Sequence, residues 1–244
     1  MDIVKLSATE STNAYLKDYL LSLEEVNDYT VVVANEQIKG RGQMGTVWVS
    51  DPGKNLTFSI SKSFDDFYAA NQFVISMCVS LAIYDFLKQL QVPNLTIKWP
   101  NDILSGNLKI AGILIENILL GSKIQVSVIG IGLNVNQMVF EGLPNVSSLK
   151  LLFGCTFNLD DLLTSFIRVF KNYFDKEIQN SKIELQSLYE NVLFRKNKPS
   201  TFKNMDGELF MGFIKGVTQQ GKLLITLEDN IVAEFDLKEV QLLY

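Results

Sequence analysis

The residues best suited to chemistry in this sequence lie in a glycine-rich loop. It reads Gly40-Arg41-Gly42-Gln43-Met44-Gly45-Thr46-Val47-Trp48. Three glycines permit positive φ angles and let backbone N–H groups approach a ligand, as in loops that bind phosphate or carboxylate groups. The loop follows an apolar, β-branched run at residues 30–34, which predicts a buried strand. Its spacing matches neither a dinucleotide fingerprint nor a Walker loop, so a plain turn is the alternative interpretation.

The sequence contains no histidine. This excludes Ser/His and Cys/His nucleophilic catalysis and removes the commonest zinc ligand. Any catalysis must therefore use lysine, arginine, carboxylates and backbone groups.

Four further segments place polar residues or glycines where an apolar strand ends or turns, and Gln37 lies just before the glycine loop. They are Glu10-Ser11-Thr12-Asn13, Lys98-Trp99-Pro100-Asn101-Asp102, Lys109-Ile110-Ala111-Gly112-Ile113-Leu114 and Gly130-Ile131-Gly132-Leu133-Asn134-Val135-Asn136. Each has a structural explanation when taken alone. Ser11 and Asn13 could cap a helix, Lys98 and Asp102 could form a surface ion pair, and the paired glycines could mark a bulge.

Together, and in this order, the segments resemble the biotin protein ligases, also called biotin–[acetyl-CoA-carboxylase] ligases. The shared motifs are Ser-Thr-Asn, G-R-G-x-x-G followed by Trp, K-W-P-N-D, K-x-A-G-I-L and G-x-G-x-N, over residues 10–136. The resemblance implies that biotin and Mg²⁺-ATP give biotinyl-AMP and pyrophosphate. A lysine of a biotin carboxyl carrier protein domain then takes the biotinyl group. The missing histidine is consistent with this reaction, because the substrates supply both nucleophiles.

The resemblance also implies roles for individual residues. Expected biotin contacts are Ser11, Thr12, Asn13, Gln37, Gly40, Arg41, Lys109 and Gly112. Expected ATP or adenylate contacts are Gly42, Gln43, Trp48, Asn101, Asp102, Lys109 and Asn134. Lys109 and Arg41 are the expected catalytic residues, and Trp48 would stack on adenine. Asp102 is a candidate Mg²⁺ contact that could equally organise its turn, and no other metal ligand is expected.

The glycine loop departs from the family pattern at two positions. Relatives often carry arginine where this chain has Gln43 and Thr46, in the pattern G-R-G-R-x-G-R. The change removes two cations from a loop that is expected to retain biotinyl-AMP. We expect Lys109 and Arg41 to suffice, and looser retention is the alternative. The glycines also predict that residues 39–47 become ordered when ligand binds.

The hydrophobic patterns and the resemblance predict an α+β fold. We expect a mixed, largely antiparallel central sheet with helices packed on it, and a small C-terminal SH3-like β-barrel. Predicted strands cover residues 3–6, 31–34, 56–61, 95–99, 109–120 and 124–135, and predicted helices cover 11–26, 69–91 and 159–178. Short β-rich pieces follow from about residue 194. We therefore expect a catalytic domain at residues 1–192 and a small barrel domain at 193–244.

The resemblance implies biotin, ATP and the carrier domain as partners, and charge and hydropathy disfavour nucleic acid and membrane as further ones. A net charge of −5 without any basic run disfavours general nucleic-acid binding. The longest uncharged apolar segment, residues 73–84, is shorter than the roughly 20 residues of a membrane span. The first residues lack a signal-peptide pattern, so we expect a cytoplasmic protein. Because catalytic sequence begins at residue 10, we expect a monofunctional ligase without DNA binding, either a monomer or a weak homodimer.

Two other functions compete with the ligase hypothesis. A lipoyl or octanoyl transferase of related architecture would need an apolar tunnel, which Gln37, Arg41 and the K-W-P-N-D segment disfavour. A non-catalytic biotin-binding sensor would need no adenylating cation, so the intact Lys109 disfavours it.

Overall fold

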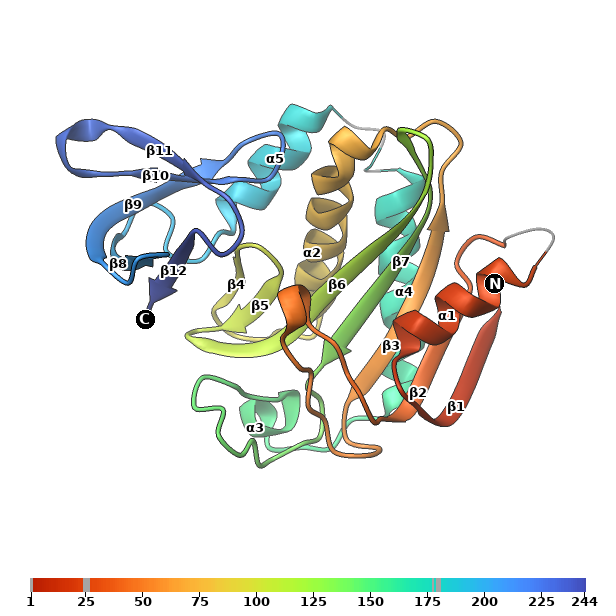
Figure 1. Ribbon diagram of the computed structural model, residues 1–244. Helices are drawn as coiled ribbons and strands as arrows, with labels where there is room; N and C mark the ends of the chain where they lie inside the picture. Colours follow the sequence, from red (N-terminus) through yellow and green to blue (C-terminus); the bar gives the residue numbers. More distant parts are fainter. Residues whose placement is uncertain (1, 24–26, 177, 179–180) are drawn as a thin grey trace.

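The chain folds into two β-sheets joined by helices (Figure 1). The computed structural model describes residues 2–23, 27–176, 178 and 181–244. The larger sheet has the strand order β1-β2-β3-β7-β6-β5-β4. Its strands are β1 (Ile3–Thr9), β2 (Val31–Gln37), β3 (Leu56–Ser63), β4 (Leu95–Lys98), β5 (Asp102–Ser105), β6 (Leu108–Leu120) and β7 (Lys123–Leu133). Only the β1–β2 pair is parallel among these described strands, which confirms the mixed, largely antiparallel sheet.

The first two strands run further than the apolar pattern predicted. Their parallel register continues to the pair Thr9 and Gln37, beyond the expected ends at residues 6 and 34. Backbone pairing tolerates the polar side chains there, because only one face of each strand has to be apolar. The extension carries Gln37 to the end of its strand, next to the start of the first helix.

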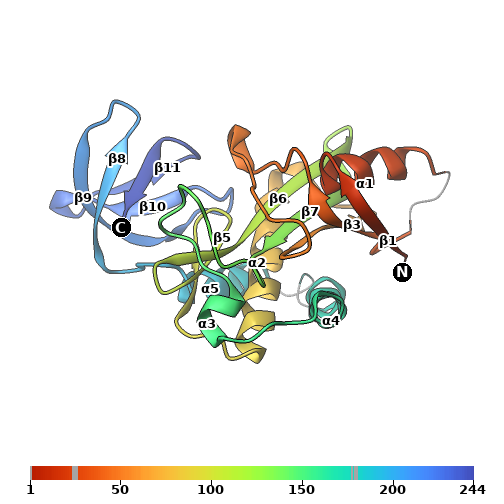
Figure 2. The ribbon, with the colours of Figure 1, turned by 90° about the horizontal axis from the view of Figure 1, so that it is seen from below.

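Helices cover both faces of the larger sheet. Helices α2 (Gln72–Gln89) and α4 (Leu159–Asp175) lie together on one face, and α1 (Thr12–Leu21) lies on the other (Figure 2). The apolar segment Ala69–Gln89 is long enough to cross a membrane, but 67% of its window is buried inside the fold. It is therefore the core helix that the sequence predicts. The predicted helix at 11–26 ends earlier, at Leu21, and residues 24–26 lie outside the described residues.

A ladder of aromatic rings fixes α4 against α2 and the sheet. Phe166 contacts Phe58 of β3, Phe86 of α2 and Phe170 of its own helix, with ring centroids 5.4, 5.6 and 5.7 Å away. Asn158 caps α4 by accepting hydrogen bonds from the N–H groups of its first turn. The helix therefore begins at a defined residue and buries one aromatic face.

Two buried tyrosines have perturbed acidities. Burial raises the pKa of Tyr29, and its hydrogen bond to Asp175 raises it further. Burial likewise raises the pKa of Tyr189, with a smaller contribution from Glu190. Both phenols stay protonated at neutral pH, and neither lines the cavity described below.

The second sheet follows α5 (Lys182–Asn191) and has the order β11-β10-β9-β8-β12. Its strands are β8 (Pro199–Asn204), β9 (Leu209–Val217), β10 (Leu223–Thr226), β11 (Val232–Phe235) and β12 (Val240–Leu243). Trp99 Nε1 donates to the carbonyl of Gly221, 2.8 Å away, and so joins the two sheets. The predicted α+β class is confirmed, and the C-terminal segment expected as a small SH3-like β-barrel forms a five-stranded antiparallel sheet. The expected boundary between residues 192 and 193 stays a prediction.

We expect Phe166→Ala to destabilise the protein by about 3–5 kcal/mol, because it removes a buried ring that three other rings contact. Chemical denaturation of both proteins measures the change. Arg168→Ala, at an exposed position of the same helix, serves as the control and should change stability by less than about 0.5 kcal/mol. Similar losses in the two variants would contradict the assignment of α4 to the core.

Candidate active site

The site lies on the sheet face opposite α2 and α4, where glycines leave the backbone bare. Two register rows cross β3, β7 and β6 there: Ser59, Gly130, Leu114 and Thr57, Gly132, Gly112. A Cβ on Gly130 would lie 2.3 Å from Asn13 Oδ1, and one on Gly132 would lie 2.3 Å from Trp48 Cε2. Both positions therefore require glycine, because another segment packs directly on the strand.

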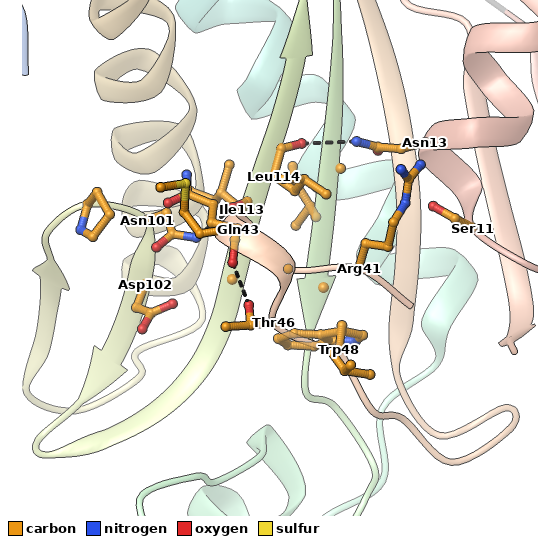
Figure 3. Close-up of a pocket in the computed structure, with 18 of the residues that line it drawn as sticks. Ser11, Asn13, Arg41, Gln43, Thr46, Trp48, Asn101, Asp102, Ile113 and Leu114 are labelled. Carbon is orange, nitrogen blue, oxygen red and sulfur yellow. Dashed lines mark hydrogen bonds between the residues drawn. The ribbon is translucent and has the colours of Figure 1, made fainter. Parts of the chain in front are cut away.

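A cavity of about 350 Å³ opens over this face (Figure 3). It brings together nearly all of the predicted site residues, which come from five separate segments of the chain. These are Ser11, Thr12, Asn13, Gln37, Arg41, Gly42, Gln43, Trp48, Asn101, Asp102, Lys109 and Gly112. Tertiary structure thus collects in one place motifs that are spread over about a hundred residues of sequence.

Two predicted contacts, Gly40 and Asn134, do not line the cavity. A Cβ on Gly40 would lie 2.3 Å from the carbonyl oxygen of Trp48, so this glycine serves the close approach of two backbone segments. Asn134 is 2% exposed, and its Nδ2 donates to the carbonyl of Ser147. It holds a neighbouring loop in this structure, and its nucleotide contact stays a prediction.

One end of the cavity is built from neutral polar groups at the start of α1. Gln37 Oε1 accepts from the Thr12 backbone N–H at 2.7 Å and from Thr12 Oγ1 at 3.0 Å. Ser11 occupies the N-cap position, but its side chain makes no capping hydrogen bond. The helix-cap explanation therefore does not account for Ser11, whose side chain faces the cavity instead.

Ser59 anchors these groups from below, a role that the sequence reasoning missed. Its Oγ lies 2.8 Å from Thr12 Oγ1 and 2.6 Å from Asn13 Oδ1, and the residue is fully buried. Asn13 Nδ2 donates to Glu116 Oε2 at 2.8 Å. The alternating small polar residues of β3, Thr57, Ser59 and Ser61, were the available signal, because they mark a strand face that lacks apolar packing.

The glycine loop forms a narrow hairpin beside the cavity. Trp48 N–H donates to the Gly40 carbonyl at 3.0 Å, and Gly42 N–H donates to the Thr46 carbonyl at 2.7 Å. The turn at its tip uses positive φ angles at Met44 and Gly45. A Cβ on Gly42 would lie 2.4 Å from Thr46 Oγ1, so a larger residue there would have to displace this hydroxyl.

The Trp48 ring packs against the glycines of β6 and β7. Besides its contact with Gly132, its Cζ3 lies 3.1 Å from where a Cβ of Gly112 would be. Lys109 Nζ is 5.6 Å from the centroid of the indole ring, within cation–π range. Trp48 Nε1 is buried and has no hydrogen-bond partner among the described residues.

The cationic end of the cavity is centred on Lys109. Its Nζ lies 2.6 Å from Asp102 Oδ1, and Lys98 Nζ lies 4.0 Å from Asp102 Oδ2. Asn101 Nδ2 donates to the carbonyl of Ile113 at 2.8 Å, while its own carbonyl accepts from Ile113 N–H. Asn101 therefore fixes the turn to β6, and Asp102 orients the lysine.

The carboxylates of the described residues form no cluster of three that could hold a metal ion by themselves. Magnesium commonly binds through one or two carboxylates together with substrate phosphates. Asp102 could supply one such oxygen, since its Oδ2 is 4.0 Å from Lys98 Nζ, whereas its Oδ1 is 2.6 Å from Lys109 Nζ.

Apolar residues and a second-sheet segment complete the cavity wall. The apolar lining includes Phe58, Ile113, Leu114 and Ile131. Leu237 and Lys238 also line it, from the turn that joins β11 to β12. Sequence reasoning could not identify these two residues, because nothing in their local pattern shows that the second sheet packs beside the first.

A family model for the biotin/lipoate A/B protein ligases matches residues 6–134, more than half of the chain. The chain belongs to the biotin/lipoate A/B protein ligase family. The matched region contains all of the motif segments that contribute to the cavity, except for residues 135 and 136 at the end of the last one. The resemblance drawn from those motifs is therefore confirmed.

Curated relatives of this family member extend over most of the chain. It is 29% identical over 235 residues to biotin–protein ligase 2 of Arabidopsis thaliana, covering 87% of this chain and 67% of that protein. It is 28% identical over 234 residues to the bifunctional ligase/repressor BirA of Escherichia coli (strain K12), covering 94% and 70%. It is 36% identical over 132 residues to a biotin–[acetyl-CoA-carboxylase] ligase of Paracoccus denitrificans, covering 53% of each. The chain thus spans about half to 70% of these relatives' lengths.

Solved structures of the family share the whole fold. A biotin protein ligase from Aquifex aeolicus in complex with biotin and ATP superimposes with a TM-score of 0.80, over 99% of this chain and 98% of that one. The sequence identity is 23%, so this likeness shows the fold alone.

We expect Gly132→Ala to displace the Trp48 ring, because the added Cβ would overlap it. Intrinsic fluorescence of the ligand-free protein should shift to longer wavelength as the indole becomes more exposed. The control is the same substitution in a Trp48→Phe background. There Trp99 is the one remaining tryptophan, and Gly132→Ala should not change its emission. An unchanged spectrum in the wild-type background would show that the ring is seated elsewhere.

Proposed function

We propose that this protein is an ATP-dependent biotin ligase. It activates biotin to biotinyl-5′-AMP and transfers the biotinyl group to a lysine of a biotin carboxyl carrier protein domain. The observation that carries the proposal is a single cavity that holds neutral hydrogen-bonding groups at the start of α1 and a lysine beside an indole ring. The A. aeolicus ligase of the same fold was solved with biotin and ATP, which supports this assignment.

The polar end suits the ureido ring of biotin. A urea offers two N–H donors and one carbonyl acceptor, and hydroxyl and amide side chains can satisfy both kinds of group. Ser11, Thr12 and Gln37 supply such groups, and Ser59 fixes their positions from the sheet. Pre-arranged partners of this kind lower the entropic cost of binding.

The cationic end suits the first chemical step. An oxygen of the biotin carboxylate attacks the α-phosphorus of ATP, the bond to the bridging oxygen breaks, and pyrophosphate leaves. Two anionic groups must approach each other, so a cation near both of them stabilises the transition state. Lys109 is held for this role by Asp102 and lies beside Trp48, which we assign to the adenine. Magnesium would arrive with the ATP phosphates, and Asp102 could contact it.

The second step needs an acceptor and exclusion of water. The lysine amine of the carrier domain attacks the acyl carbon of biotinyl-AMP, and AMP leaves with the electrons of the broken bond. The glycine loop flanks the cavity and would shield this mixed anhydride. Lys238 adds a cation from the second sheet, which offsets part of the charge missing at Gln43 and Thr46.

The other expectations about partners remain proposals. We propose a cytoplasmic location, because ATP is a substrate of the first step. We also propose that the chain acts without DNA or membrane partners, as a monomer or weak homodimer. A lipoyl or octanoyl transferase is less favoured, because the polar end offers a lipoyl chain few apolar contacts.

Pyrophosphate exchange into ATP tests the function directly. We expect labelled pyrophosphate to enter ATP only when biotin is present, because the reversible first step requires the biotin carboxylate. Lipoate, octanoate and an acid-free reaction are the controls. Exchange that is equally fast without biotin, or that lipoate supports better, would overturn the assignment.

Lys109→Ala should slow the adenylation step by about a hundredfold or more, while biotin affinity falls much less. The reason is that the lysine neutralises charge that develops in the transition state, whereas the ring is held at the other end of the cavity. Single-turnover adenylation and calorimetric titration with biotin measure the two effects. Lys123→Ala, a surface lysine paired with Asp66, is the matched control. If the adenylation rate and the biotin affinity fall equally, Lys109 contributes to binding alone and not to the chemical step.

A further inference from the structure

Glu116 is a charged residue on the site face of β6 that no motif singled out. Side chains alternate along a strand, so residue 116 follows Gly112 and Leu114 on the same face. Its register partner on β7 is the fully buried Val128, and its own side chain is 29% exposed. A carboxylate in such a half-buried position is costly unless other groups pair with it.

Two groups meet at one oxygen of this carboxylate. Asn13 Nδ2 donates to Glu116 Oε2 at 2.8 Å, and Arg41 Nη2 lies 3.7 Å from the same oxygen. Asn13 is itself fixed, because its Oδ1 lies 2.6 Å from Ser59 Oγ on the buried strand β3. Figure 3 shows the Arg41 guanidinium directed toward Asn13. The negative charge thus has a set position on the sheet and faces the loop.

Glu116 is the ion-pair partner of Arg41 among the residues that the structure describes. Arg41 is the only cation between Gly40 and Trp48, and its side chain is 49% exposed. No other ion pair joins residues 40–48 to the sheet in the part of the chain that the structure describes. A guanidinium carries five N–H donors, so contact through one nitrogen leaves the remaining donors available to a ligand.

We propose that Glu116 is a positioning residue that holds Arg41 over the polar end of the cavity. It acts through Arg41 and touches no substrate itself. The ion pair ties the glycine loop to the sheet and keeps its single cation ready to retain an anionic adenylate. The inference rests on the proposed function for its activity measurement, but its structural consequence can be tested without any ligand.

Glu116→Gln is the informative substitution, because the amide keeps an oxygen that can accept from Asn13 and loses only the charge. We expect biotinyl-AMP to dissociate about threefold faster, the size expected for a partly exposed ion pair. The maximal rate of pyrophosphate exchange should change by less than about twofold. Glu116→Asp retains the charge and should restore part of the retention. Added salt should narrow the difference between wild type and Glu116→Gln.

A double-mutant cycle separates positioning from a general structural role. If Glu116 acts through Arg41, Glu116→Gln has no further effect on dissociation in an Arg41→Ala background. An effect that persists there in full would overturn the proposal and assign Glu116 to the Asn13 network. Asp66→Asn removes the same charge from an ion pair with Lys123 that lies outside the cavity, so it should leave dissociation unchanged.

Hydrogen exchange of the ligand-free protein provides the test that is independent of biotin. We expect amides of residues 41–48 to exchange faster in Glu116→Gln than in wild type or Asp66→Asn. Unchanged exchange would overturn the proposal even if the protein is an active ligase. Failure of biotin-dependent pyrophosphate exchange in the wild type would instead refute the proposed function and leave this result standing.

Discussion

The site depends on the close approach of other segments to the bare backbone of β6 and β7. Gly130 and Gly132 present no side chain on the site face, and Asn13 and Trp48 occupy the space at distances that any Cβ would violate. Helix α1 and the glycine loop can therefore both reach the sheet. Larger residues at these positions would push both segments outward, and the polar end would separate from the cationic end. The large side chains lie on the opposite face of the sheet, where aromatic rings pack α2 and α4 against it.

A buried polar network makes this arrangement rigid. Ser59 lies beneath Thr12 and Asn13, and Gln37 satisfies two donors of Thr12. Buried polar groups are costly without partners, so each member restricts the position of the next. Rigid hydrogen-bonding groups are what a small neutral ring requires. The second sheet adds a constraint of its own, because Trp99 donates to Gly221 and so ties the K-W-P-N-D segment to that sheet.

Charge is distributed so that the two cations from the larger sheet and its loop, Lys109 and Arg41, each have an acidic partner. Asp102 orients Lys109, and Glu116 faces Arg41. A paired cation keeps a fixed direction and still attracts an incoming anion, because one carboxylate does not satisfy all of its donors. With Gln43 and Thr46 in the loop, the orientation of the remaining cations matters more than their number. Lys238 brings a further positive charge from the second sheet.

The sequence by itself indicated the family and the residue types of the site. The ordered motifs carried the family resemblance, the absence of histidine excluded histidine-dependent catalysis, and alternation and helical periodicity predicted the main elements, because these signals are local. Tertiary structure alone decided which polar residues meet. Glu116 and Lys238 carry no local signature, and Ser59 is marked only by the alternation of its strand. The roles of all three arise from pairing between segments distant in sequence. Asn134 likewise has a contact that its motif does not indicate, the hydrogen bond from its Nδ2 to the Ser147 carbonyl. Residue types and their periodicity in a short stretch of sequence predict helices, strands and motifs. Contacts between distant segments depend on strand register and on packing, which no short stretch contains.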